Sequence, residues 1–421
     1  MTIALIFVSL FGLLILGAPI GAAIGLAVVV GMFAADIQSI FLVQKLVTAL
    51  DSFPLLAVPF FVMAGEIMQK GGMAERLLTL SRSLVGHITG GTAHISVLTC
   101  LFFGALSGSS PATVAAVGGI MVPKMKEEGY DNDYATAVNT SAGCLGVMIP
   151  PSVPLIIYGT TAGVSVGDLF IAGILPGLLV GLALMACAYV IAKRRGYAAT
   201  SHRHSPAEIG RALVGSVHAL MVPIIVLGGI YGGIMTPTEA GVSAVAYALA
   251  VETLVLRAIG LRDVWDILRR TVLTTASIFF LVATATALGQ ILLFQKVPDL
   301  MVDFMVGISG DRHVLLILII VLLLVVGTFM DALANILILT PLLLPVIREV
   351  GIDPIPFGIV MIVSIAMGFL TPPVGVNLFV GCSIGNISIE RLSVAVLPFL
   401  GAMVLALLVL AFVPQISLIL L

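Results

Sequence analysis

Two stretches of the chain, GVMIPPSVPLIIYGTTAG (146–163) and GFLTPPVGVNLFVGCSIG (368–385), place a Pro-Pro pair inside an apolar run. Proline lacks a backbone N–H and restricts the residue before it, so each break leaves carbonyl groups without helical partners. Carbonyl and hydroxyl oxygens at a helix break are suitable ligands for a hard cation, and the N-terminus of the next half-helix favours an anion. The two breaks are therefore candidate ion-binding points.

Polar side chains accompany both breaks. The segments GALSGSSPAT (104–113) and VGTFMDALAN (326–335) contain an acid, an amide and several hydroxyls within apolar surroundings: Ser107, Ser109, Ser110, Asp331 and Asn335. An intramembrane acid is expensive and is usually functional, although Asp331 could instead cap the helix that carries Asn335. Neutral groups that suit a hydroxylated or carboxylated solute follow the breaks: Ser152, Thr160, Thr161, Asn377 and Ser383.

Glu66, in MAGEIM, is a second candidate carrier of an ion or a proton. It lies near the end of its apolar segment, so simple exposure at the membrane interface is an equal alternative. A serine nucleophile at Ser107 is a weaker idea, because no membrane histidine is placed to activate it and HExxH is absent. An intramembrane hydrolase is therefore a poor second hypothesis.

The amino-acid composition indicates whether these residues lie in water or in a lipid bilayer. Hydrophobic residues make up 60% of the chain and charged residues 10%, and the mean hydropathy is +1.24. Repeated apolar runs of about twenty residues predict a polytopic membrane protein. The four cysteines, Cys100, Cys144, Cys187 and Cys382, lie singly in apolar segments and are expected to be inert.

Hydropathy predicts membrane spans and two re-entrant hairpins. The spans are 2–33, 52–69, 131–166, 168–192, 212–234, 237–256, 273–295, 354–388 and 392–420, and the hairpins are 89–124 and 312–347. LRDVWDILRR (261–270) is a basic amphipathic stretch that reads as an interfacial helix on the cytoplasmic face. With a cytoplasmic N-terminus, this layout leaves only Lys45, Lys296, Arg312 and Arg348 outside among the 19 Lys and Arg, as the positive-inside rule demands.

The breaks belong to an internal repeat. Residues 104–176 align with 326–398 without a gap, and eight of the matching residues are Gly or Pro, including both Pro-Pro pairs. The predicted topology gives the two halves opposite orientations. Broken helices at matching positions of inverted repeats are typical of secondary transporters, whose site lies near the membrane midplane.

The predicted fold class is an all-α polytopic membrane protein with inverted repeats, each containing a re-entrant hairpin and a broken helix. The expected parts are N-terminal scaffold spans (1–70), a connecting arm helix (71–88), transport-domain repeat 1 (89–168), scaffold spans (169–296), a second arm helix (297–311), transport-domain repeat 2 (312–390) and a C-terminal span (391–421).

Four motifs, GALSGSSPATVAAVG, MIPPSVPLIIYG, MTPTEAG and FLTPPVGVNLFV, follow in this order over essentially the whole chain. Together they resemble the large membrane subunit of the tripartite ATP-independent periplasmic (TRAP) transporters. The resemblance implies an elevator-type transporter architecture, in which hairpins and broken helices move as one body against a scaffold. The resemblance implies a bacterial inner-membrane symporter that takes up an organic acid with a sodium gradient, with two or more Na+ ions and no organic cofactor. It also implies two partners, a periplasmic substrate-binding protein and a small four-helix membrane subunit on a separate chain.

The resemblance implies sodium ligands at the tips and breaks: Ser107, Ser109, Gly143, Gly146 and Pro150 in one half, and Gly327, Asp331, Gly368, Thr371 and Pro372 in the other. The residues alone also permit a stand-alone, proton-coupled anion carrier that uses Asp331 or Glu66. Sialic acid is the favoured solute, followed by a C4-dicarboxylate.

Overall fold

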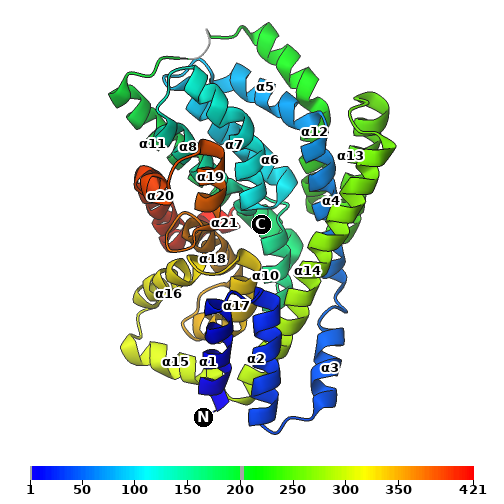
Figure 1. Cartoon of the computed structure of the whole chain (residues 1–421), viewed down its shortest axis with the longest axis vertical. Coiled ribbons are helices and arrows are strands. Elements are labelled where there is room, and N and C mark those ends of the chain that lie inside the picture. The colour runs from blue at the N-terminus through cyan, green and yellow to red at the C-terminus, as the bar shows by residue number, and fades with distance from the viewer. Residues whose placement is uncertain (1, 200–202) are drawn as a thin grey trace.

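The computed structural model describes residues 2–199 and 203–421, and every regular element in these ranges is a helix (Figure 1). The α-helices are α1 (Thr2–Ile15), α2 (Ile20–Ala34), α3 (Ser39–Thr48), α4 (Ala57–Lys70), α5 (Met73–Val85), α6 (Gly91–Ser107), α7 (Ser110–Glu127), α8 (Asn132–Ala142), α9 (Leu145–Met148), α10 (Val153–Ala162), α11 (Val166–Arg195), α12 (Pro206–Tyr231), α13 (Pro237–Ala250), α14 (Leu261–Phe294), α15 (Val297–Ile308), α16 (Arg312–Gly327), α17 (Ala332–Glu349), α18 (Pro354–Gly368), α19 (Val376–Gly385), α20 (Ile389–Phe412) and α21 (Gln415–Leu418). A 3-10 turn (Phe53–Leu56) precedes α4, and a π-helical turn (Val251–Val255) follows α13.

The apolar character predicted from the sequence is confirmed by the helices. Seven of them, among the described residues, are long and apolar enough to cross a membrane, and the bent pair formed by 132–148 and 153–162 makes an eighth candidate. The helices α4, α11, α12, α13 and α20 correspond to predicted spans. The capping box predicted at TPTEAG is present, because the Thr236 side chain accepts from Glu239 N and the Glu239 carboxylate accepts from Thr236 N.

The prediction of one span over 2–33 is wrong. Residues 2–15 and 20–34 form two antiparallel helices. Thr2 Oγ1 donates to Ala34 O (3.2 Å), so the start of α1 and the end of α2 lie together. The physical reason is the GAP sequence at 17–19, where Gly17 adopts a positive φ and Pro19 precedes the first turn of α2. One long apolar run therefore folds as a hairpin.

The amphipathic segment 261–270 is helical, as predicted, and it is continuous with the span predicted at 273–295. These residues form the first turns of the 34-residue helix α14, which continues to Phe294. No glycine or proline interrupts the segment that joins the amphipathic turns to the apolar ones, so nothing ends the helix there. Trp265 remains exposed on this part of α14.

The internal repeat predicted from the sequence appears in the structure as two units with the same order of helices. The helices α7 and α17 each contain 18 residues and begin 222 residues apart, and α8 and α18 also begin 222 residues apart. Each unit therefore consists of a helical hairpin (α6–α7 or α16–α17), a turn, and a helix broken at Pro-Pro (α8–α10 or α18–α19). Both Pro-Pro peptide bonds are cis.

The two units interlock. The half-helix α19 packs on α7 and α8 of the first unit, and α10 packs on α17 and α18 of the second. Hydrogen bonds join the units, from Asn132 Nδ2 to Gly385 O (2.7 Å) and from the Tyr158 hydroxyl to Pro354 O (2.6 Å). The two hairpins and the two broken helices therefore form one packed body.

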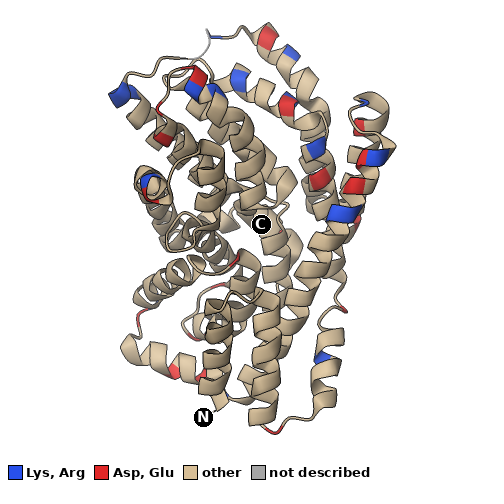
Figure 2. Cartoon of the chain, viewed as in Figure 1, with Lys and Arg blue, Asp and Glu red and all other residues tan. Residues whose placement is uncertain are grey.

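Basic residues gather at one end of the molecule. Figure 2 shows most Lys and Arg near α5, the end of α11, the start of α12 and the start of α14, while few lie around α1 to α3 and α15. The N-terminal end of α1 lies at the end poor in basic residues (Figures 1 and 2). The N-terminus, predicted to be cytoplasmic, thus lies at the end of the molecule opposite most of the basic residues.

Candidate functional site

The first hairpin tip contacts the first helix break. The chain leaves α6 at Ser107, takes a positive φ at Gly108, is extended at Ser109 and enters α7 at Ser110. Thr113 Oγ1 donates to Ser109 O (2.8 Å) and lies 2.7 Å from Ser107 Oγ. Hydroxyl and carbonyl oxygens of the tip are thus held together within one helical turn.

The second tip is built differently. Asp331 is the N-cap of α17, and its Oδ2 accepts from Leu333 N (3.1 Å). The capping alternative considered for Asp331 is therefore realised, whereas its counterpart Ser109 occupies an N-cap position without a side-chain capping bond in the described structure. In the second break, Thr371 Oγ1 donates to Met367 O (3.2 Å) and Gly375 N donates to Thr328 O (3.3 Å).

Glycine allows each tip to touch its break. A Cβ atom at Gly146 would collide with Thr113 Oγ1 and would lie 2.6 Å from Ser109 O. A Cβ atom at Gly368 would collide with the backbone of Gly327. Backbone oxygens of tip and break can approach one another in both units because these positions carry no side chain.

Two buried asparagines make hydrogen bonds next to the hairpin tips. Asn377 Nδ2 donates to Ser110 Oγ (2.7 Å) across the units, and Asn335 Nδ2 donates to Met330 O (3.2 Å). Neither Oδ1 atom has a hydrogen-bond partner among the described residues. A buried amide oxygen without a partner is a free acceptor, which suits a cation or a hydroxyl of a solute.

Both tips border one cavity of about 340 Å³, which we call the tip cavity. Its wall includes residues 107–112 of the first tip, Asp331 to Leu333 of the second tip, Val147, Val153, Pro154 and Phe369 from the breaks, Val62, Glu66 and Gln69 from α4, and Thr274 and Ile278 from α14. The structure therefore brings Ser107, Ser109, Ser110 and Asp331 together. Glu66 also lies in the cavity wall, with its side chain 25% exposed.

The charge of the tip cavity is mixed. Glu66 and Asp331 supply carboxylates, and no Lys or Arg of the described chain is part of the wall. Three helices, α7, α10 and α17, begin at this wall, and helix N-termini carry partial positive charge. The cavity can therefore hold a cation beside oxygen ligands and an anion beside helix ends.

The remaining predicted residues lie elsewhere. Thr160 and Thr161 line a second cavity of about 290 Å³, together with residues of α14 and α17. Ser152 is buried and donates to Val147 O (2.7 Å), while Ser383 is exposed on α19 and lines neither cavity. The substrate-binding set predicted from the sequence is thus divided between several places, because residues that follow a break point to different sides of the half-helix.

The remaining predicted sodium ligands are backbone positions beside the breaks. Gly143 packs against Val114 of α7, Pro150 packs against Gly173 of α11, and Pro372 is exposed between α18 and α19. Sequence reasoning missed Thr113, which lies one helical turn after Ser109, and Gly104, whose added Cβ would lie 2.7 Å from Leu145 O. Helical spacing from Ser109 could have identified Thr113.

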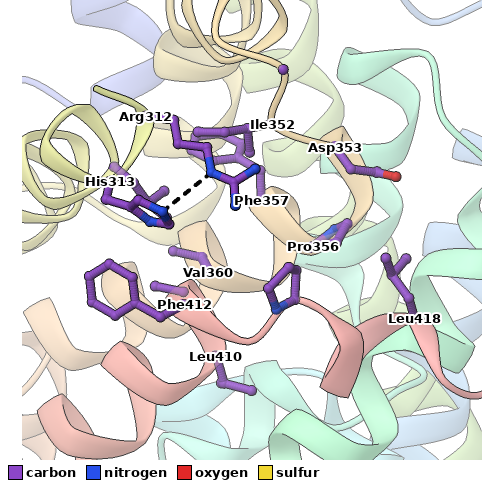
Figure 3. Close-up of a pocket in the computed structure, with 14 residues that line it drawn as sticks. Arg312, His313, Ile352, Asp353, Pro356, Phe357, Val360, Leu410, Phe412 and Leu418 are labelled. Atoms are coloured by element: carbon purple, nitrogen blue, oxygen red, sulfur yellow. Dashed lines mark hydrogen bonds between the residues drawn. The ribbon is translucent and has the colours of Figure 1, made fainter. Parts of the chain in front are cut away.

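A smaller pocket of about 150 Å³ lies apart from these residues, between α16, α18 and α20 (Figure 3). Arg312 and His313 face Phe412 across it, and Arg312 Nε lies 3.4 Å from His313 Nε2. None of the predicted site residues lines this pocket.

The interlocked repeats, broken helices and polar tip cavity define a membrane transporter. The chain belongs to the DctM component family of tripartite ATP-independent periplasmic transporters, whose family model matches residues 7–416. This confirms the resemblance seen in the sequence and excludes the hydrolase hypothesis, since the relatives are named as transporter permeases.

Three relatives illustrate the similarity. The chain is 46% identical over 404 residues to the isethionate TRAP transporter permease protein DctMQ of Oleidesulfovibrio alaskensis, which covers 96% of this chain and 64% of that protein. It is 38% identical to the sialic acid TRAP transporter large permease protein SiaM of Vibrio cholerae, over 97% of this chain and 96% of that protein. It is also 38% identical to the C4-dicarboxylate TRAP transporter large permease protein DctM of Pseudomonas aeruginosa, over 89% of this chain and 87% of that protein. Among solved structures, the fold resembles the Alcanivorax borkumensis YdaH transporter, with a TM-score of 0.64, 17% identity and coverage of 89% and 88%.

Proposed function

We propose that this chain is the large permease subunit of a sodium-coupled transporter that takes up an organic anion across the bacterial inner membrane. The observation that supports this most directly is the tip cavity, where both hairpin tips, both breaks and three helix N-termini meet. Sodium would be held by Ser107, Ser109, Gly143, Gly146 and Pro150 in one half and by Gly327, Asp331, Gly368, Thr371 and Pro372 in the other. Two or more ions would balance the charge of an anion in a place without Lys or Arg.

The proposed solute is a small organic acid. The relatives named above act on isethionate, sialic acid and C4-dicarboxylates, and their identities of 46%, 38% and 38% favour isethionate over the sialic acid expected from the sequence. Ser110 lines the tip cavity and would contact it directly. Asn335 and Asn377 are fully buried beside the tips and would contact it only after a local opening. Ser152, Thr160, Thr161 and Ser383 would have to contact it in another conformation.

The proposed partners are a periplasmic substrate-binding protein and a small four-helix membrane subunit. The word tripartite in the family's description supports this. We also propose that the N-terminal end of α1 faces the periplasm, because it lies opposite the basic end of the molecule.

We further propose an elevator motion, in which 89–168 and 312–390 move as one body against the scaffold segments 1–70 and 169–296. The arms 71–88 and 297–311 would connect the two parts. Packing of α10 on α17 and of α19 on α7 supports the single body.

Radiolabelled uptake into vesicles tests the proposal. Vesicles that contain this chain and its small subunit are given isethionate, sialic acid or succinate at micromolar concentration, with and without the binding protein. We expect sodium-dependent uptake of one solute only when the binding protein is present. Robust uptake without it would favour a stand-alone carrier.

Proton coupling is the second candidate, because both Glu66 and Asp331 line the tip cavity. It predicts that an imposed pH gradient drives uptake when sodium is absent.

A further inference from the structure

In the described part of the chain, the tip cavity offers no positively charged side chain that could bind the acid group of an organic anion. The wall holds the carboxylates of Glu66 and Asp331, and no Lys or Arg of the described residues belongs to it. Helix N-termini offer only partial charges, and their effect falls off within one turn. A cation near the cavity would therefore have a large effect on where the anion binds.

Arg270 is such a cation. Thr274 and Ile278 of α14 line the tip cavity, and Arg270 lies one helical turn before Thr274 on the same face. Its Nη1 lies 3.9 Å from Oε2 of Glu66, which is itself part of the wall. The side chain of Arg270 is 68% exposed and that of Glu66 25%, so the guanidinium lies at the mouth of the cavity, towards the end of α14 where the basic residues gather.

Another cation between α4 and α14, Lys70, provides a comparison because its charge is fully paired. Lys70 Nζ lies 2.7 Å from Asp263 and 3.3 Å from Asp266, so two carboxylates hold it. Arg270 has one ion pair among the described residues, and that pair is long. Since a guanidinium carries five donors in a plane, most of them remain available for a second acid group.

We propose that Arg270 binds the acid group of the transported anion at the mouth of the tip cavity, and that Glu66 competes with the anion for this guanidinium. The inference rests on the proposed function. It assigns the anion-recognising residue to α14, outside the two repeat units. A carboxylate or sulfonate suits this role because its oxygens accept two parallel N–H groups.

The competing explanation is that the pair only joins α4 to α14. In that case Arg270 and Glu66 would act together on stability, and loss of either would leave the affinity for solute unchanged. Under the proposal their effects on affinity have opposite signs. The two explanations are therefore separable.

Exchange in proteoliposomes tests the inference. The complete complex is reconstituted, and the internal concentration of unlabelled solute that gives half-maximal exchange is measured with whichever of isethionate, sialic acid or succinate the wild type accumulates. We expect Arg270→Gln to raise this concentration about tenfold, Arg270→Lys to raise it less, and Glu66→Gln to lower it. The sodium concentration for half-maximal exchange should stay unchanged in the two Arg270 variants.

Arg269→Gln is the matched control, because it removes the same charge from an exposed neighbour for which the described structure shows no ion pair with a residue of the cavity wall. Equal effects of Arg269→Gln and Arg270→Gln would show that only the overall positive charge of this surface attracts the anion, and they would overturn the inference. So would an unchanged affinity in Arg270→Gln. Absence of any sodium-dependent transport by the wild type would instead refute the proposed function itself.

Discussion

Asp331 and Ser109 occupy equivalent positions in the repeat but differ in charge. Both stand at the N-cap of the second hairpin helix, and only Asp331 uses its side chain to cap. A carboxylate beside a cation site strengthens binding in a low-dielectric interior, whereas hydroxyls and carbonyls alone bind more weakly. The two halves of the site are thus expected to contribute unequally to sodium binding.

Asp331→Asn tests this asymmetry. Asparagine is also a good N-cap, so the variant should fold while it loses the charge. We expect the sodium concentration for half-maximal uptake to rise about tenfold or more, equivalent to about 1.4 kcal/mol of binding free energy. Ser109→Ala should have a smaller effect. A wild-type sodium titration curve for folded Asp331→Asn would show that the residue is only a helix cap.

Thr113→Val tests the residue that sequence reasoning missed. Valine keeps the shape of the side chain but removes the hydroxyl that donates to Ser109 O. Since one such hydrogen bond contributes about 1 kcal/mol, the sodium requirement should rise roughly fivefold. Thr99→Val, at a buried position of α6, is the control and should leave the titration curve unchanged. Similar curves for both variants would remove Thr113 from the site.

At the scale of elements, the arm helix α5 is attached through a buried acid. Glu252, in the π-helical turn after α13, is fully buried and accepts from Gly72 N (2.9 Å) and Met73 N (3.0 Å) at the start of α5. Its carboxylate satisfies two N–H groups that no helical carbonyl can reach. The acid therefore holds the connection between α4 and α5 against α13.

Glu252→Ala should lower the thermal stability of the purified protein. Two N–H groups lose their acceptor, and each buried unsatisfied group costs about 1–3 kcal/mol. Glu75→Ala removes an exposed acid from the first turn of the same helix and serves as the control. Thermal unfolding in detergent measures both, and equal midpoints would contradict the anchoring role of Glu252.

The repeat made these elements predictable from the sequence. Gly and Pro positions report backbone shape directly, so the offset of 222 residues located both hairpins and both breaks. The turn at 17–19 and the length of α14 were missed because hydropathy alone measures apolar length and does not detect a reversal of the chain or a change of environment along one helix. Thr160 and Thr161 line a different cavity from Ser110 because α10 packs against α17, and no local sequence pattern predicts that packing.

At the scale of the whole molecule, the proposed motion requires the interlocked units to slide against α14. Gly289 of α14 faces Pro341 of α17, and a Cβ atom at Gly289 would lie 3.8 Å from Pro341 Cγ. Cysteines at both positions, in a variant without the four native cysteines, should form a disulfide in this conformation.

Closing that disulfide should abolish uptake, and reduction should restore it. The two single-cysteine variants, each alkylated, control for blockage of the nearby cavity and should retain transport. Undiminished uptake with the disulfide closed would exclude sliding of α17 along α14.

The central claim is that a sodium gradient drives uptake of an organic anion through this chain. The most direct measurement is accumulation of radiolabelled isethionate, sialic acid or succinate in proteoliposomes that contain the complete complex and its binding protein, under imposed gradients of sodium or of protons. We predict accumulation of one solute with an inward sodium gradient and none with a proton gradient alone. Accumulation that follows the proton gradient and ignores sodium would contradict the account.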